Sequence, residues 1–148
     1  MKSIIITMSL LTVVILSSLT VRKNNHLGDD WNGNGGGNSD LGDTIYAVAN
    51  GYINTAKDIS GAWGNIIRIT HYLAYKSQVE SIYAHCNELF VDSGNFVGIG
   101  TAIGTAHGKY PAHLHFEMRS DLNLPIGGGY SLNKDGCLDP TAFIRAHR

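Results

Sequence analysis

One nine-residue stretch, PAHLHFEMR at residues 111–119, constrains the fold of this chain more than any other. The apolar residues Leu114, Phe116 and Met118 alternate in it with polar residues. Since side chains two positions apart lie on the same face of a strand, this alternation predicts a strand with one face in a core. The polar positions, which would share the other face, are His113, His115, Glu117 and Arg119.

The two histidines of this strand would lie about 6–7 Å apart, because a strand rises about 3.3 Å per residue. That separation suits one metal ligand and one catalytic neighbour. An amphipathic strand with two solvent-exposed histidines explains the same alternation, so the strand alone leaves both interpretations open.

Length and composition favour one small β-rich domain. The chain has 148 residues, enough for one domain with a real core. Its net charge of −1 argues against a nucleic-acid-binding protein, which usually carries a basic patch. The 18 glycines, set between short β-branched runs, are typical of a turn-rich β protein.

The N-terminal segment is interpreted separately from the folded domain. Lys2 precedes an apolar run from Ile4 to Leu19, which predicts that residues 1–20 are a secretory signal peptide. An uncleaved membrane anchor is the alternative, since about 17 apolar residues is the lower limit for a span. We expect the folded domain at residues 24–148. In an exported chain Cys86 and Cys137 could form a disulfide, although two unpaired thiols fit the sequence nearly as well.

Short runs rich in β-branched residues predict the strands of this domain. A hairpin is expected where Asn50-Gly51 joins two of them. Glycine, asparagine and aspartate before the first run predict a loop across the front of the sheet. A helical turn is expected at residues 87–92, and a terminal helix with Asp139 as its N-cap. The expected strands are residues 44–49, 52–56, 65–71, 78–85, 96–97, 101–105 and 113–119.

A second group of candidate ligands is His26-x-x-x-Asp30. A catalytic zinc site uses three protein ligands and a water molecule, and it accepts imidazole nitrogen and carboxylate oxygen. His26, Asp30 and His115 would supply such a set, although spacing alone leaves Asp29 equally available. His85 ends an expected strand and could face the same groove as His113.

Five segments taken together resemble a known family. HLGDDW, GDTIYAVANGYI, GNIIRITH, YAH and GTAIGTAHGKYPAHLHFEMR, in this order, resemble the LytM/lysostaphin-type zinc metallopeptidases, which cleave peptidoglycan peptides. The resemblance extends from about Asn25 to Pro140. It implies a mainly β fold: a small antiparallel β-sheet domain with a substrate groove, of the duplicated-hybrid-motif type.

The resemblance also implies the roles of five residues. The zinc ligands would be His26, Asp30 and His115, holding one Zn²⁺ per chain. His85 and His113 would be the catalytic pair, and the sequence does not say which of them is the general base. The implied reaction is hydrolysis of a peptide bond by water that zinc activates.

Two functions in different classes are compatible with this resemblance. The first is an exported zinc endopeptidase of the bacterial periplasm, cell envelope or exterior, a monomer whose partner is a peptidoglycan peptide and not a nucleic acid. The second is an inactive binding module that regulates another cell-wall hydrolase. A zinc-dependent amidase or D-dipeptide hydrolase would share the metal chemistry of the first.

The remaining polar residues near these motifs receive other expectations. Glu117 shares the face of His115, so it could orient an imidazole or face solvent. We expect His71 to be structural, and we do not expect His107 to be a ligand.

Overall fold

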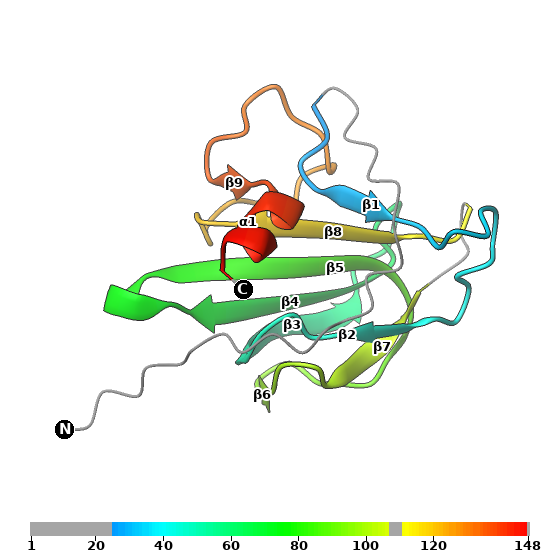
Figure 1. The fold of residues 1–148 in the computed structure, drawn as a ribbon, viewed down its shortest axis with the longest axis horizontal. Coiled ribbons are helices and arrows are strands. Elements are labelled where there is room, and N and C mark those ends of the chain that lie inside the picture. The colour runs from blue at the N-terminus through cyan, green and yellow to red at the C-terminus, as the bar shows by residue number, and fades with distance from the viewer. Residues whose placement is uncertain (1–24, 107–110, 148) are drawn as a thin grey trace.

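The computed structural model describes residues 25–106 and 111–147 (Figure 1). The expected leader at residues 1–20 and the loop residue His107 therefore lie outside the described residues. Among the helices that are described, none is long and apolar enough to cross a membrane.

Nine strands form one antiparallel sheet in the described part of the chain. The main path runs β1-β8-β5-β4-β3-β6, while β7 pairs with β5 and β2, and β9 pairs with β8. The elements are β1 (Asp29–Trp31), β2 (Thr44–Tyr46), β3 (Gly51–Asp58), β4 (Asn65–Tyr72), η1 (Ala74–Lys76), β5 (Gln78–Leu89), β6 (Phe96–Val97), β7 (Ala102–Ala106), β8 (Leu114–Arg119), β9 (Cys137–Leu138) and α1 (Pro140–Ala146).

The hydrophobic core lies on one face of this sheet. Alternate residues of the central strands, such as Ile67, Tyr83 and Phe116, are buried there, and Ile45 of β2 and Ile144 of α1 join the same cluster. Helix α1 lies across β8 and β5 (Figure 1). Fully burying one aliphatic side chain in this core stabilises the fold by about 1.5–3 kcal/mol.

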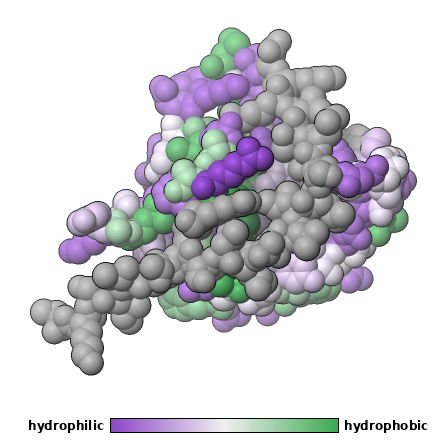
Figure 2. All heavy atoms as spheres, in the orientation of Figure 1, coloured by the Kyte–Doolittle hydropathy of each residue, from purple (hydrophilic) through white to green (hydrophobic). Residues whose placement is uncertain are grey.

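Away from helix α1, the end of the β4–β5 hairpin projects from the body of the domain. Hydrophilic residues gather at its tip, on the left of Figure 2.

The mainly β, antiparallel fold expected from the sequence is confirmed. The strands expected at residues 65–71, 78–85, 96–97, 101–105 and 113–119 are present, with shifts of a few residues at their ends. The terminal helix is also present. The side chain of Asp139 accepts a hydrogen bond from the amide of Ala142, and Pro140 occupies the first turn.

The hairpin expected at Asn50-Gly51 is wrong. Strand β2 pairs with β7, whereas β3 pairs with β4 and β6. Gly51 serves close packing instead of a turn, because a Cβ there would lie 2.5 Å from Ile69 Cγ2 and 2.6 Å from the Thr70 carbonyl oxygen. Glycine is therefore required for the approach of two strands.

Two further expectations are corrected. The helical turn expected at residues 87–92 is wrong, because β5 continues to Leu89 and pairs there with Gly104 of β7. The expected front loop contains a strand, β1, whose residues pair with β8.

Cys86 is buried in β5 with a free thiol, so the structure does not join it to Cys137. Burial raises the pKa of Cys86 to about 12.

His71 is a structural histidine between strands, as expected. Its Nδ1 donates to the Asn50 carbonyl (2.9 Å), which leaves Nε2 to accept from the Ser81 hydroxyl (2.7 Å). Burial lowers the pKa of His71 by disfavouring the charged ring, and the hydrogen bond to Asn50 opposes this only in part.

This arrangement predicts acid sensitivity. The unfolded chain binds a proton at His71 near pH 6.5, above the pKa in the folded chain, so stability falls as pH drops below about 6.5. We expect His71→Asn, which keeps a donor toward Asn50, to lose less unfolding free energy than wild type between pH 7.5 and 5.5. Urea denaturation with a chelator present measures both chains. Equal losses would show that His71 contributes nothing to the acid sensitivity.

Candidate metal centre

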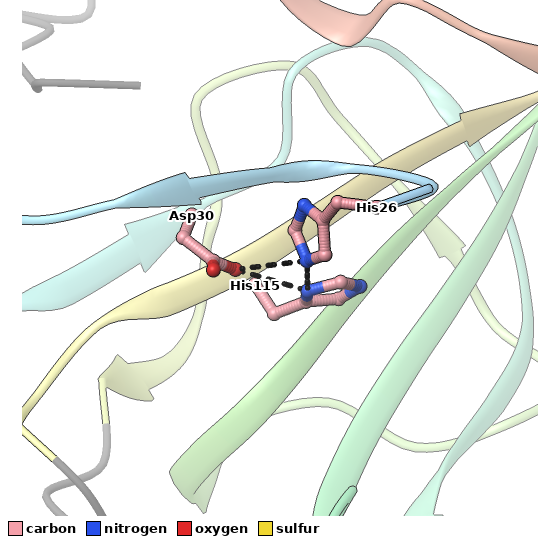
Figure 3. A group of neighbouring side chains, drawn as sticks. All are labelled: His26, Asp30 and His115. Carbon is pink, nitrogen blue, oxygen red and sulfur yellow. Dashed lines mark hydrogen bonds and ion pairs between the residues drawn. The ribbon is translucent and has the colours of Figure 1, made fainter. Parts of the chain in front are cut away.

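The pairing of two strands brings the three expected ligands together. In the β1–β8 register Asp30 lies opposite His115, and His26 lies just before β1. The three side chains point toward one another in Figure 3. One ligand atom from each lies within 4.8 Å of the others.

The contacts among these atoms are short. Nε2 of His26 lies 3.1 Å from Nδ1 of His115 and 3.4 Å from Oδ1 of Asp30. Oδ1 of Asp30 lies 3.0 Å from Nδ1 of His115. Two imidazole nitrogens and one carboxylate oxygen thus surround a single point. This is the donor set of a catalytic zinc site, so the residues present fit the metal.

The outward nitrogen of each ligand imidazole is engaged by protein oxygen. His26 Nδ1 donates to the Gly28 carbonyl at 2.7 Å, because a carbonyl can only accept. His115 Nε2 donates to Oε1 of Glu117 at 2.9 Å. These contacts turn Nε2 of His26 and Nδ1 of His115 toward Asp30. Outer acceptors of this kind orient imidazole ligands and raise their basicity.

The electrostatics of the centre favour a cation. Burial lowers the pKa of His115, but hydrogen bonds to Asp30 and Glu117 outweigh that effect and raise the pKa to about 9. Burial would raise the pKa of Asp30, yet the hydrogen bond to His115 and the nearby imidazoles keep it below its ordinary value. The centre therefore stabilises positive charge between these groups.

Glu117 contacts the candidate ligand His115 and does not face solvent. Its side chain is completely buried, and Oε2 accepts from Nε and Nη2 of Arg119 at 2.9 and 2.7 Å. Burial alone would raise the pKa of Glu117, but His115 and Arg119 lower it. Of the two readings left open by the sequence, the structure supports the one in which Glu117 orients an imidazole.

The expected catalytic pair lies beside the ligands. The rings of His85 and His113 are 4.9 Å apart between centroids, and His85 is 5.7 Å from His115. Nδ1 of His113 donates to the Pro111 carbonyl at 2.8 Å, which leaves Nε2 as an acceptor 3.9 Å from Oδ1 of Asp30. The structure therefore brings all five expected site residues into one cluster.

His85 occupies an unusual backbone position. Its φ of +59° lies in the left-handed region, at a bulge where β5 carries an extra residue opposite β4. A non-glycine residue there costs about 1–3 kcal/mol, and such strain clusters at functional sites. Burial, followed by the nearby imidazoles of His113 and His115, lowers the pKa of His85 to about 4. The ring is therefore neutral at pH 7.

Sequence reasoning missed two aromatic residues of this cluster. The indole of Trp63 stacks on His85 at 6.3 Å and meets His115 edge-on at 5.2 Å. The ring of Tyr130 lies 4.8 Å from that of His26. Both residues come from loops without a motif, and an aromatic ring among glycines was the one available indication.

A cavity of about 420 Å³ adjoins Trp63 and His85. Its other lining residues are Asp58, Ser60, Gly61, Gly64, Asn65, Cys86 and Asn87.

The other candidate side chains point elsewhere. Asp29 turns toward α1, where Oδ2 accepts from the hydroxyl (2.7 Å) and amide (3.2 Å) of Thr141. Of the two adjacent carboxylates, Asp30 is therefore the one beside the histidines. His71 is engaged by Asn50 and Ser81, away from the centre.

A family model described as peptidase family M23 matches residues 24–127, which is more than half of the chain. The chain belongs to peptidase family M23. This confirms the resemblance to LytM/lysostaphin-type peptidases. No curated protein sequence matches the chain.

Solved structures share the fold of this M23 peptidase. Lysostaphin from Staphylococcus simulans, described as an antimicrobial peptidase, aligns over 82% of this chain and 45% of its own, at 23% identity and a TM-score of 0.60. LytU aligns over 93% of this chain and 92% of its own, at 18% identity and a TM-score of 0.62. A zinc-containing peptidase from Vibrio cholerae aligns over 63% of this chain and 26% of its own, at 27% identity and a TM-score of 0.51. The chain thus spans less than half the length of lysostaphin.

A substitution at Gly28 tests whether metal binding needs the close approach of β1 to β8. A Cβ at Gly28 would overlap the Phe116 carbonyl oxygen and lie 2.7 Å from Cγ of Glu117, forcing β1 away from β8. We expect Gly28→Ala to weaken Zn²⁺ binding about tenfold, the low end of the effect of disturbing a ligand's supporting partner. Competition with a chromophoric chelator measures the affinity.

Gly128→Ala is the matched control, since nothing lies within 4 Å of a Cβ at Gly128. Its affinity for Zn²⁺ should equal that of wild type. Unchanged affinity in a folded Gly28→Ala chain would show that the strand approach does not limit the metal site.

Proposed function

We propose that this M23 peptidase is a zinc metalloendopeptidase that hydrolyses peptide cross-links of peptidoglycan. The observation that carries the proposal is the convergence of His26, Asp30 and His115, with His85 and His113 beside them. Three residues would hold one Zn²⁺ per chain, and two would handle protons.

A zinc ion bound there would supply a Lewis acid that polarises the scissile carbonyl and lowers the pKa of a water molecule. The chain's own residues supply the proton transfers. His113 presents Nε2 toward the centre, because its Nδ1 is held by Pro111. His85 directs Nδ1 toward the Trp63 carbonyl at 3.3 Å, which leaves its Nε2 for a reacting group. A positioned imidazole of this kind typically contributes about 10²–10⁴-fold to the rate.

The substrate class is proposed from the family and the cavity. Lysostaphin, which shares the fold, is described as an antimicrobial peptidase. In this chain the cavity beside Trp63 and His85 would take the part of a peptide next to the scissile bond. Export to the cell envelope or beyond through residues 1–20, with the catalytic domain at residues 24–148, would bring the enzyme to such a substrate. We propose that it acts as a monomer.

An inactive module that regulates another wall hydrolase is the alternative, and it is less well supported. A module without catalysis needs neither the metal ligands nor two histidines beside them. Here all five positions carry side chains able to perform these roles, and the ligands are oriented by Gly28 and Glu117.

Two single substitutions in the full-length chain, His115→Ala and His113→Ala, test the proposal. We expect wild type to hold about one zinc per chain and to clear a peptidoglycan suspension. His115→Ala should lose both properties, since it removes a ligand. His113→Ala should keep zinc and lose about 10²-fold or more in rate. Elemental analysis, turbidity and mass spectrometry of the products are the measurements.

His147→Ala is the control, because His147 caps the C-terminal end of α1 and its Nδ1 bonds the Phe143 carbonyl instead of a residue of the metal centre. Full clearing by a chelator-treated, zinc-free chain would overturn the proposal. Stoichiometric zinc without cleavage of any wall peptide would favour the regulatory module. Release of whole stem peptides from sugar would indicate an amidase instead.

A further inference from the structure

We propose that Arg119 is a positioning residue that couples the metal ligand His115 to the aromatic wall of the cavity. The inference rests on the proposed zinc site and goes beyond it, because it assigns a role to a buried charge that touches neither metal nor substrate. Arg119 is 1% exposed and lies on the same face of β8 as His115 and Glu117.

The first half of the coupling runs through Glu117. The two carboxylate oxygens of Glu117 have different partners. Oε1 accepts from Nε2 of His115, and Oε2 accepts from two N–H groups of Arg119. Two charge-assisted hydrogen bonds that converge on one oxygen fix the position of that oxygen. The guanidinium therefore determines how Glu117 presents Oε1 to His115, and so how Nδ1 of His115 faces the centre.

The second half runs through the loop that follows β8. Nη1 of Arg119 donates to the carbonyls of Leu124 (3.1 Å) and Pro125 (2.9 Å), and Nη2 donates to that of Ile126 (3.2 Å). Three consecutive carbonyls thus converge on one side chain. The carbonyl of the next residue, Gly127, accepts from the indole Nε1 of Trp63 at 2.8 Å.

The same loop then reaches the surroundings of His26, the second candidate ligand that it contacts. The Gly129 carbonyl accepts from the amide of Leu27 at 2.9 Å, and Tyr130 pairs with His26 in a β-bridge. The ring of Tyr130 lies against the His26 imidazole. The segment held by Arg119 therefore contacts the surroundings of two ligands and of His85.

Arginine is required for this geometry. A guanidinium has five N–H groups in a rigid fork, and the contacts above use all five: two on Glu117 and three on the loop. A lysine ammonium could remain near Glu117 as a point charge, but it could not hold three carbonyls as well. Arg119→Lys therefore separates the two halves of the coupling.

Arg68 offers a matched control on the same sheet. It also donates through Nε and Nη2 to a buried glutamate, although here the two groups contact the two different oxygens of Glu80 at 3.0 and 2.7 Å. Glu80 lies opposite Arg119 in the β5–β8 register. Among the described residues, no hydrogen bond of the Arg68–Glu80 pair reaches a candidate metal ligand or the loop at residues 120–130. Arg68→Gln thus removes a comparable ion pair without removing a hydrogen bond from either half of the coupling.

The experiment uses the full-length chain with Trp31→Phe, which leaves Trp63 as the sole tryptophan. Phenylalanine keeps an aromatic ring against Phe116, which Trp31 contacts. The variants Arg119→Gln, Arg119→Lys and Arg68→Gln are compared by Zn²⁺ affinity against a chelator, by acrylamide quenching of Trp63 and by Tm.

We expect Arg119→Gln to weaken Zn²⁺ binding about 10–100-fold, as loss of an outer partner does, and to increase the quenching of Trp63. Arg119→Lys should restore most of the Zn²⁺ affinity while Trp63 remains as accessible as in Arg119→Gln. Arg68→Gln should lower Tm and leave both other measurements unchanged.

Two results would overturn the coupling. The first is wild-type Zn²⁺ affinity or wild-type quenching in a folded Arg119→Gln chain. The second is an equal effect of Arg68→Gln, which would indicate general destabilisation. If Arg119→Gln does not fold, the split between affinity and quenching in Arg119→Lys decides the question. Absence of zinc from the parent chain would count against the proposed function, whereas quenching would still test the link between Arg119 and Trp63.

Discussion

The pairing of β1 with β8 is the contact on which the rest of the site depends. Only three residue pairs join these strands, yet they place Asp30 opposite His115 and bring His26 beside both. A shift of one residue would turn Asp30 to the opposite face of the strand. Several contacts hold the register: Asp29 bonds Thr141 of α1, Trp31 packs on Phe116, and Gly28 permits the close approach.

The two faces of the sheet bury different kinds of side chain. One face buries aliphatic and aromatic side chains beneath α1, and the other buries charges in pairs. Burying an unpaired charge costs several kcal/mol, so each buried glutamate on this face has an arginine partner: Glu117 with Arg119, and Glu80 with Arg68. In the first pair the remaining carboxylate oxygen reaches His115, a candidate metal ligand. The polar face thus connects the stability of the sheet with the orientation of the site.

Much of the fold followed from short-range pattern. Alternation predicted β8, β-branched runs predicted β4 and β5, and a capping aspartate before proline predicted α1. The wrong expectations concern residues whose type occurs in more than one kind of local structure. Gly51 looked like a turn residue, but it is glycine because Ile69 and Thr70 leave no space for a Cβ. Likewise, Asn87–Leu89 looked helical alone and became strand through its pairing with β7.

The sequence by itself determined which chemistry the chain could carry. The His26–Asp30 spacing, the alternation around His115 and the YAH element supplied candidate side chains, because donor types and strand period are local properties. The resemblance to LytM/lysostaphin-type peptidases then selected the five residues that the structure clusters. Only the tertiary structure decided which carboxylate faces the histidines, that Glu117 bonds His115, and that Trp63 stacks on His85. These contacts join residues that strand register and loop packing bring together, and no local pattern encodes a distance between segments that meet only after folding.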